Sequence, residues 1–420
     1  MKSICLCFKV HQPIRLRLYR FFEMGNSDYY YDDYTNEMIL RRVAESCYLP
    51  ANKIILDLIN KYQGSFRIAF SISGTAIDQF KIYAPDVIES FRKLAATGCV
   101  EFLAETYSHS LSALKDENEF RRQVDSHATV IETLFGKRPT VFANTEFIYS
   151  DEIGAQVAGM GYKATLTNEP TPFLKWKCPN YLYKNAINPA LMVLLKNERL
   201  SDDIAFRFSN SAWSGWPLTA AKYVSWLNKI PEEEKIVNLF MDYETFGEHQ
   251  KLGSGIFKFL GSLPSEVLHN SDFQFMTPSE VAQHHQPVAA IDVPRPISCA
   301  DQERDLTAWL GNELQQEAFE KLYVLSGMIG KCNDPALLKD WQYLQTSDHL
   351  YYMSTKYFSD GDVHAYFNPY DSPYMAFMNY MNVLNDFSIR LNREMSGKGK
   401  VQAINRPNNL TRSKLIEHYN

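Results

Sequence analysis

Several features that would assign this chain to a well-defined class are missing from its sequence. The 420 residues include seven cysteines and no CxxC pair, so no disulfide framework is expected. No hydrophobic run reaches the length of a membrane-spanning helix, and the apolar stretch near the N-terminus is short and lacks a small-residue cleavage site. The formal net charge of -6 lacks the basic excess of a nucleic-acid-binding protein. These absences predict a cytoplasmic protein with reduced thiols and with neither a membrane nor a nucleic acid as partner.

Motifs for several other kinds of chemistry are absent as well. No GxGxxG follows a strand-like run, no GxxxxGK[ST] occurs and there is no GxSxG elbow, which disfavours nucleotide-dependent enzymes and serine hydrolases. No two histidines have the HxxxH spacing of a zinc site. We therefore predict no cofactor and no metal. The histidines considered as metal ligands are His11, His109, His249, His284 and His285.

The chain is rich in the residues that build a core, with a hydrophobic fraction of 45%, 25 Tyr, 26 Phe and 6 Trp. Eight short β-type runs occur, and helix-period stretches such as 51–62 and 85–96 lie between several of them. Strands that alternate with helices predict parallel β/α units. The runs are Ile4–Val10, Phe66–Ile72, Val100–Leu103, Thr140–Ala143, Lys163–Leu166, Leu191–Leu195, Ile236–Met241 and Phe273–Met276.

Polar or ionisable residues follow these runs repeatedly. A β/α barrel builds its active site from the C-terminal ends of several strands, whereas an open doubly wound sheet concentrates chemistry at one switch point. The spread over many strand ends favours a closed or nearly closed barrel of seven or eight strands. The residues concerned are His11, Ser73, Glu105, Glu146, Asp242 and Thr277.

The domain organisation follows from a change of pattern near residue 290. Residues 288–297 are flanked or interrupted by three prolines and are interpreted as a linker, after which apolar residues keep helical spacing. We predict a catalytic barrel over residues 1–290 and a helical domain over 298–395. The polar residues 396–420 are predicted to form a loosely ordered tail.

Two carboxylates stand out as candidates for catalysis. Glycoside hydrolysis needs one carboxylate to attack the anomeric carbon and one to protonate the leaving oxygen, and the two must converge from different parts of the chain. Glu146 and Asp242 each follow an apolar run, so each is expected to point into the barrel mouth. Asn144 and His249 flank them. An ordinary surface carboxylate after a strand is the alternative for each residue taken alone.

Further residues could bind a sugar. Glu101 and Glu105 share one face of a strand by period two, and Glu105 and His109 could hold sugar hydroxyls. A structural role for Glu101 is the alternative. Trp213 and Trp216 lie in a loop-like sequence, where packing against the barrel rim competes with a role in stacking on sugar rings.

Five segments of the chain together resemble the family-57 glycoside hydrolases, specifically their α-amylase branch. The resemblance covers nearly the whole chain in order and with credible spacing. The segments are His11–Pro13, Gly98–Glu101 with Glu105–Ser110, Asn144–Tyr149, Met241–His249, and Asp301–Asn312 with Asp305 and Trp309.

The resemblance implies an incomplete seven-stranded β/α barrel, of the α/β class, followed by a helical domain that completes the substrate cleft. It also implies a retaining mechanism on α-1,4-glucans or maltooligosaccharides, with Glu146 as nucleophile and Asp242 as general acid/base. Sugar-binding roles are implied for His11, Glu101, Asp305 and Trp309, and we add Glu244 and His249 from the fourth segment. Asp242 must hold its proton near neutral pH, so burial or the charge of Glu146 is expected to raise its pKa.

The chain departs from the α-amylase branch at two positions. Ala143 stands where the branch favours Arg, and Cys299 stands where it favours Trp. An arginine on the strand that leads to the nucleophile would lower the pKa of that carboxylate. Its absence is therefore expected to affect the rate of the reaction and not the identity of Glu146.

Three other functions compete with hydrolysis of a glucan. A 4-α-glucanotransferase would use the same chemistry with a sugar hydroxyl as acceptor in place of water. A glucan-binding protein of weak activity would need neither carboxylate. A metal-dependent polysaccharide deacetylase would need a triad of Asp and His near the barrel top, and no matching cluster is seen in the sequence. The sequence leaves the acceptor, the preferred chain length and the oligomeric state open.

Overall fold

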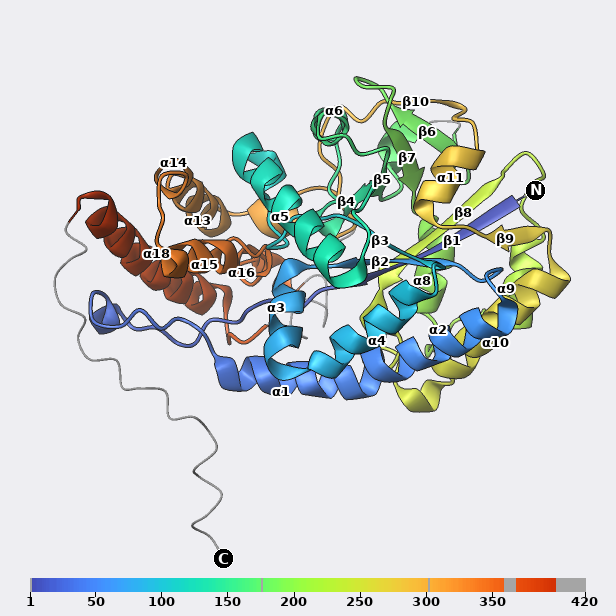
Figure 1. Ribbon diagram of the computed structural model, residues 1–420, viewed down its shortest axis with the longest axis horizontal. Helices are drawn as coiled ribbons and strands as arrows, with labels where there is room; N and C mark the ends of the chain where they lie inside the picture. Colours follow the sequence, from blue (N-terminus) through green and yellow to red (C-terminus); the bar gives the residue numbers. More distant parts are fainter. Residues whose placement is uncertain (1, 175–176, 301–302, 359–367, 398–420) are drawn as a thin grey trace, which may run out of the picture.

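The computed structural model describes residues 2–174, 177–300, 303–358 and 368–397. It combines a barrel of parallel strands wrapped by helices with a group of helices built mainly from the last third of the chain (Figure 1). The fold is the α/β class predicted from the sequence, an incomplete β/α barrel followed by a helical region. Of the predicted loosely ordered tail, only Ser396 and Gly397 are among the described residues.

The barrel is a ring of parallel strands, and β1 (Lys2–Val10) is its longest strand. β1 pairs with β2 and β8, and β2 pairs with β3. Ala104 joins β3 to β4, since its N–H donates to Val141 and its carbonyl accepts from Ala143. β4 pairs with β5 and β5 pairs with β7. The remaining strands of the ring are β2 (Ile68–Ile72), β3 (Val100–Phe102), β4 (Val141–Ala143), β5 (Ala164–Thr167), β7 (Met192–Leu195) and β8 (Ile236–Asp242).

The ring is closed only loosely between β7 and β8. No ladder joins these two strands in the sheets of the described chain, and the contact consists of the Asn197 N–H donating to Asn238 O at 2.8 Å and the Asn238 side-chain amide donating to Leu195 O at 2.9 Å. This seam makes the barrel incomplete, because the other neighbouring strands share parallel ladders, except β3 and β4, which are joined by the bridge at Ala104.

All eight predicted strands are present, and the eighth lies outside the ring. β9 (Phe273–Phe275) pairs only with the start of β1, at Lys2–Ile4. Two strands were not predicted. β6 (Leu182–Asn185) is antiparallel to β7, and β10 (Ala289–Ile291) pairs with β6 inside the segment interpreted as a linker. Both are short, and their few apolar residues are interrupted by polar residues or prolines, so they lack a strand pattern of their own.

Helices cover the outside of the ring and bury its outward-facing side chains. α4 begins with Pro85 and buries Val87, Ile88, Phe91 and Leu94 on one face, as its spacing predicted. The helices around the barrel are α1 (Asp33–Val43), α2 (Leu49–Tyr62), α3 (Gly74–Tyr83), α4 (Pro85–Ala96), α5 (Glu117–Phe135), α6 (Asp151–Gly159), α8 (Glu198–Ala205), α9 (Ala220–Leu227), α10 (Ile256–Asn270) and α11 (Pro278–His284).

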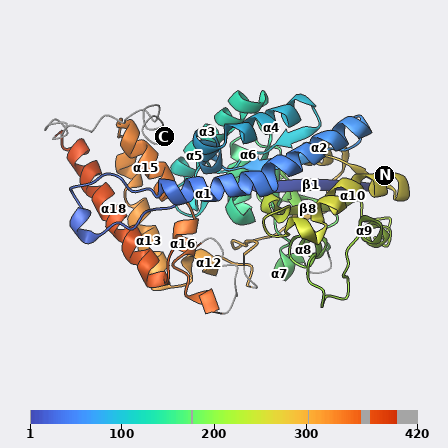
Figure 2. The ribbon, with the colours of Figure 1, turned by 90° about the horizontal axis from the view of Figure 1, so that it is seen from below.

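The C-terminal helices form a second hydrophobic core around the buried Trp341. An N-terminal loop also belongs to this core, because Tyr30 is fully buried there and donates to Asp386 of the last helix. Figure 2 shows this loop beside the last helix. The helices are α12 (Thr307–Leu310), α13 (Glu313–Tyr323), α14 (Ser326–Ile329), α15 (Pro335–Leu344), α16 (Asp348–Tyr351) and α18 (Pro373–Met395).

Two expectations about the whole chain can be compared with this structure. Among the described residues, no helix is both long enough and apolar enough to cross a membrane. All seven cysteines lie in the described part of the chain and are free thiols, and five of them are buried.

Candidate active site

The polar residues that follow the strands converge at the C-terminal mouth of the barrel. Glu146 follows β4, Asp242 ends β8 and His11 follows β1. Lys9 pairs in register with both Ser71 of β2 and Asp242 of β8. Parallel strands end at one edge of a sheet, which explains why residues far apart in sequence meet here.

Glu146 stands at the centre of this cluster in a strained backbone conformation. Its φ and ψ are 50° and 29°, in the left-handed region that residues with a side chain rarely adopt. Its side chain is 25% exposed, so the carboxylate is accessible from the mouth. Strain of this kind costs about 1–3 kcal/mol and persists where the surrounding structure holds it. Here the backbone carbonyl of Glu146 accepts from the Cys299 N–H at 3.0 Å.

Two cationic side chains hold one oxygen of Glu146. Lys9 Nζ and His109 Nε2 both contact Oε1, the histidine at 2.8 Å. Burial alone would raise the pKa of Glu146, but Lys9 and His109 together lower it well below the usual carboxyl range. Oε2 is contacted by the Cys299 thiol at 3.5 Å. Oε1 is therefore fixed, and Oε2 is the less encumbered oxygen.

His109 lies between two carboxylates and is protonated for that reason. Its Nδ1 is 3.2 Å from Glu105 Oε2, and its Nε2 faces Glu146. A carboxylate only accepts hydrogen bonds, so each ring nitrogen must donate. Burial and Lys9 lower the pKa of His109, but the two carboxylates raise it more. The other carboxylate oxygen of Glu105, Oε1, accepts a hydrogen bond from Ser71 Oγ at 2.9 Å.

His11 links the barrel to the helical region. Its Nε2 is 2.9 Å from Asp348 Oδ2 and its Nδ1 is 2.8 Å from Ser73 Oγ. Burial and then the charge of His109 lower the pKa of His11, and Asp348 opposes that shift. The ring stacks on His109, with centroids 3.9 Å apart. Although burial opposes it, His11 lowers the pKa of Asp348 to about 2.

Asp242 differs from Glu146 in its exposure. It is the exposed last residue of β8, whereas the six residues before it are buried. The burial that we expected for this carboxylate is therefore not observed. Its charge acts on Lys9, Glu244 and His249. Lys9 connects the two carboxylates, because it is the register partner of Asp242 and its ammonium group bonds Glu146.

Glu244 lies beneath Asp242 in a buried hydrogen-bonded site. It accepts from the hydroxyl of Tyr48, which ends a π-helical turn over Ala44–Tyr48 between α1 and α2. π-turns re-aim side chains at functional sites. The same turn explains Gly247, because a Cβ there would lie 1.9 Å from Ser46 O and the φ of this residue is 113°. His249, at the exposed end of the loop, donates its N–H to Glu244 O at 2.9 Å.

The substitution Glu244→Gln is expected to raise the free energy of unfolding relative to wild type at alkaline pH. Burial and then Asp242 raise the pKa of Glu244 from 4.5 to about 8. The folded protein thus binds the extra proton, so the free energy of unfolding falls as the pH rises from about 4.5 to about 8. Relative to wild type, Glu244→Gln should gain on the order of 4 kcal/mol between pH 4.5 and pH 9. Urea unfolding of both proteins at the two pH values measures this, and a difference independent of pH would contradict it.

Four residues predicted from the sequence to bind substrate lie outside the cluster. Trp213 packs edge to face on Trp226 of α9 at 5.9 Å, in agreement with the packing alternative, and Trp216 is exposed in the same loop. Trp309 is 2% exposed in the core of the helical region. Asp305 accepts from the N–H and hydroxyl of Thr307 at the start of α12. Trp213 and Trp309 pack against other side chains and Asp305 lies in a turn, whereas a sugar-binding role for the exposed Trp216 stays a prediction.

Glu101 is a fifth predicted residue that lies outside the cluster, and the register gives the reason. Glu101 pairs with Ala69, which pairs with Cys7, so it lies one layer of the barrel below Lys9 and Ser71. Its carboxylate accepts from the backbone N–H of Ser279 at the start of α11, at 2.9 Å. Glu101 is partly exposed, and this contact favours the structural role that was the alternative stated from the sequence. Its neighbour by period two, Glu105, does reach the cluster.

The structure also adds two residues that the sequence analysis missed. Lys9 shares the inward face of β1 with Cys5, Cys7 and His11 by period two, and a lysine on such a face is a signal that could have been used. Asp348 starts a short helix in the C-terminal region. It shows no sequence pattern that separates it from other helix-capping aspartates.

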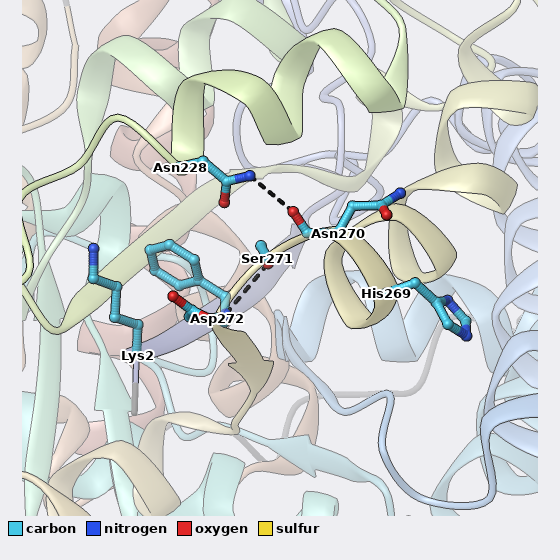
Figure 3. A pocket seen from close by; sticks show the side chains of 7 residues that line it. Lys2, Asn228, His269, Asn270, Ser271 and Asp272 are labelled. Atoms are coloured by element: carbon cyan, nitrogen blue, oxygen red, sulfur yellow. Dashed lines mark hydrogen bonds between the residues drawn. The ribbon is translucent and has the colours of Figure 1, made fainter.

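A separate hollow opens at the opposite end of β1 and is not part of this cluster. It is lined by Lys2, by Asn228 and by residues 269–273 around the end of α10. Figure 3 shows two hydrogen bonds among its lining residues, from the Asn228 side chain to Asn270 O and from Phe273 N to Ser271 Oγ. The mouth around Glu146 is thus the place where ionisable side chains converge.

Comparison with known proteins gives a consistent result. The family model named Glycosyl hydrolase family 57 matches residues 5–294 of this chain. A protein from Methanocaldococcus jannaschii that carries the provisional name alpha-amylase is 40% identical over 412 residues. These residues make up 95% of this chain and 86% of that protein.

Two solved structures share the fold. A GH57 branching enzyme from Thermococcus kodakaraensis gives a TM-score of 0.70 at 14% identity, over 96% of this chain and 92% of that chain. A 4-alpha-glucanotransferase from Thermococcus litoralis gives a TM-score of 0.61 at 14% identity, over 83% of this chain and 56% of that chain. At this level of identity the likeness concerns the fold alone.

Proposed function

Because the chain belongs to glycosyl hydrolase family 57, we propose that it is a retaining glycoside hydrolase that cleaves α-1,4-glucosidic bonds in glucans or maltooligosaccharides. The observation that carries this proposal is the arrangement around Lys9, which has Glu146 bonded to its ammonium group and Asp242 as its register partner. Two carboxylates from different strands thus converge at one mouth. The provisional name of the relative at 40% identity supports the same substrate class.

The two carboxylates differ in the way that the first half of the reaction requires. Glu146 is held as a carboxylate by Lys9 and His109, which suits a nucleophile. In the first step a bond forms between a Glu146 oxygen and the anomeric carbon while the glycosidic bond breaks. The leaving oxygen takes its proton from Asp242. The exposure of Asp242 fits this role, because the leaving part of the chain must be able to depart towards solvent.

The second half of the reaction returns Asp242 to its starting state. Asp242, now a carboxylate, removes a proton from the acceptor, which attacks the anomeric carbon and releases Glu146. Water as the acceptor gives hydrolysis with net retention, and a sugar hydroxyl gives transfer. The remaining residues of the proposed substrate site are His11, Glu105, His109, Glu244 and His249, with Asp348 added from the structure.

Products formed from maltoheptaose test this function directly. Purified protein and a Glu146→Gln variant are incubated with maltoheptaose, and the products are separated by chromatography. Shorter maltooligosaccharides from the wild type alone are the expected result. Products longer than maltoheptaose would show that the enzyme transfers 4-α-glucan chains and does not only hydrolyse them. If neither protein formed any product, a catalytic role on this substrate would be rejected.

A further inference from the structure

We propose that Lys9 is a positioning residue whose buried ammonium group holds Glu146 through Oε1 and keeps it in the carboxylate form, so that Oε2 is the oxygen that attacks. This inference rests on the proposed function, because it assigns a task within that reaction. It goes beyond it by naming the attacking oxygen and the residue that selects it.

The position of Lys9 is enforced by the strand that carries it. Ile4, Leu6, Phe8 and Val10 of β1 face outward into the core beneath the helices. The alternate residues face the barrel interior, where Cys5 and Cys7 pack with Ala69 and Ala143. Lys9 continues this inward row, and its side chain is 11% exposed. A lysine that is shielded from water in this way requires an anionic partner, and that partner is Glu146.

The selection of one oxygen follows from the contacts of Glu146. Lys9 and His109 both bond Oε1, whereas Oε2 meets only the thiol of Cys299 among the hydrogen-bonding partners found in the described chain. A thiol is a weak donor, and burial followed by the charge of Glu146 raises the pKa of Cys299 so that it stays protonated. Two charge-assisted bonds therefore lower the basicity of Oε1, and Oε2 keeps the lone pair that can form a bond to carbon.

Lys9 also supplies a cation near Glu146 in place of the arginine that the α-amylase branch favours at position 143. β4 leads to Glu146 through Ala143, which carries no charge, and β1, which is not adjacent to β4 in the ring, brings an ammonium group to the same carboxylate instead. His109 cannot serve alone, because it is shared with Glu105. The charged or titratable groups found to act on Glu146 or on these partners include Lys9, His11, Glu105, His109, Lys196, Asp242, Cys299 and Asp348.

Three substitutions separate charge from hydrogen bonding and from packing. Lys9→Met removes the charge and the donor, Lys9→Gln removes the charge and keeps a donor, and Lys9→Arg keeps both. The measurement is the pH dependence of kcat/KM on a maltooligosaccharide, whose acid limb reports ionisation of the nucleophile in the free enzyme. Without the cation, Glu146 becomes protonated at higher pH. We expect the acid limb to move up by about 1–3 pH units in Lys9→Met and Lys9→Gln, and to stay within about half a unit of wild type in Lys9→Arg.

A second readout makes the test independent of turnover. In protein labelled with ¹³C at the glutamate carboxyls, the signal absent from Glu146→Gln identifies Glu146, and its titration is followed in each Lys9 variant. An upward shift of that titration in Lys9→Met supports the inference even if no glucan is cleaved, in which case only the proposed function fails. An unchanged titration and acid limb in a folded Lys9→Met protein would overturn it. An unshifted titration of Glu146 in Lys9→Gln would also overturn it, because a hydrogen bond without a charge would then be enough to keep Glu146 ionised.

Discussion

Replacing Glu146 with Ala is expected to lower kcat/KM on maltoheptaose by about ten thousandfold or more, because the covalent half-reaction loses its nucleophile. Azide is small enough to enter the space left by the carboxylate. With an activated aryl α-maltooligosaccharide, azide should restore turnover and give a glycosyl azide of β configuration, since it attacks from the face that Glu146 occupied. The anomeric configuration of the product is read by NMR.

The matched control for this experiment is Glu101→Ala, which removes a carboxylate from the same barrel one layer lower. No azide product is expected from it, because Glu101 faces the start of α11 and not the mouth. Rescue of Glu146→Ala by azide with α configuration, or no rescue together with near wild-type cleavage, would remove Glu146 from the role of nucleophile.

Replacing Asp242 with Ala is expected to have a large effect that depends on the leaving group. Cleavage of maltoheptaose should fall by about a hundredfold to ten thousandfold, the usual contribution of a positioned acid. A substrate with a leaving group that needs no protonation, such as an α-maltosyl fluoride, should form the glycosyl-enzyme at a much less reduced rate. Azide then attacks that intermediate from the face opposite Glu146 and gives the α-glycosyl azide.

The opposite configurations expected from the two variants distinguish the roles of the two carboxylates in one assay. Equal losses on maltoheptaose and on the fluoride would show that Asp242 is not the acid. A β-azide from Asp242→Ala would exchange the two assignments. Asp242 is exposed, so the substitution leaves no cavity in the core of the barrel.

The strands of the barrel and the residues at their ends were predictable because both are local properties. A buried parallel strand is a short apolar run, and the residue that follows it must lie at the mouth, so His11, Glu146 and Asp242 could be chosen in advance. The helices around 51–62 and 85–96 were equally clear, since their apolar faces keep a period of 3.6. β6 and β10 were missed because they are held by their neighbours and not by a pattern of their own.

The partners of each site residue were decided by register and by packing between regions, which no local pattern contains. Glu101 and Glu105 lie on one face of the same segment, and only the pairing of β3 with β2 shows that the first lies below the mouth and the second within it. Asp348 reaches His11 across 337 positions of sequence. A tryptophan such as Trp309 is a residue type that often stacks on sugars, but Trp309 is buried in the core of the C-terminal helices.

The sequence by itself determined the barrel and the strand ends that form its mouth, because period and strand length are read along the chain, and it predicted the two carboxylates from the chemistry of glycoside cleavage. The tertiary structure alone decided which oxygen of Glu146 is held, which cation holds it and which region closes the cluster from the other side. The physical reason is that charge interactions depend on distances of a few ångströms between strands. Those distances are set by the pairing of β1 with β8 and by the packing of α16 against the barrel mouth. Neither can be read from the order of residues in the chain.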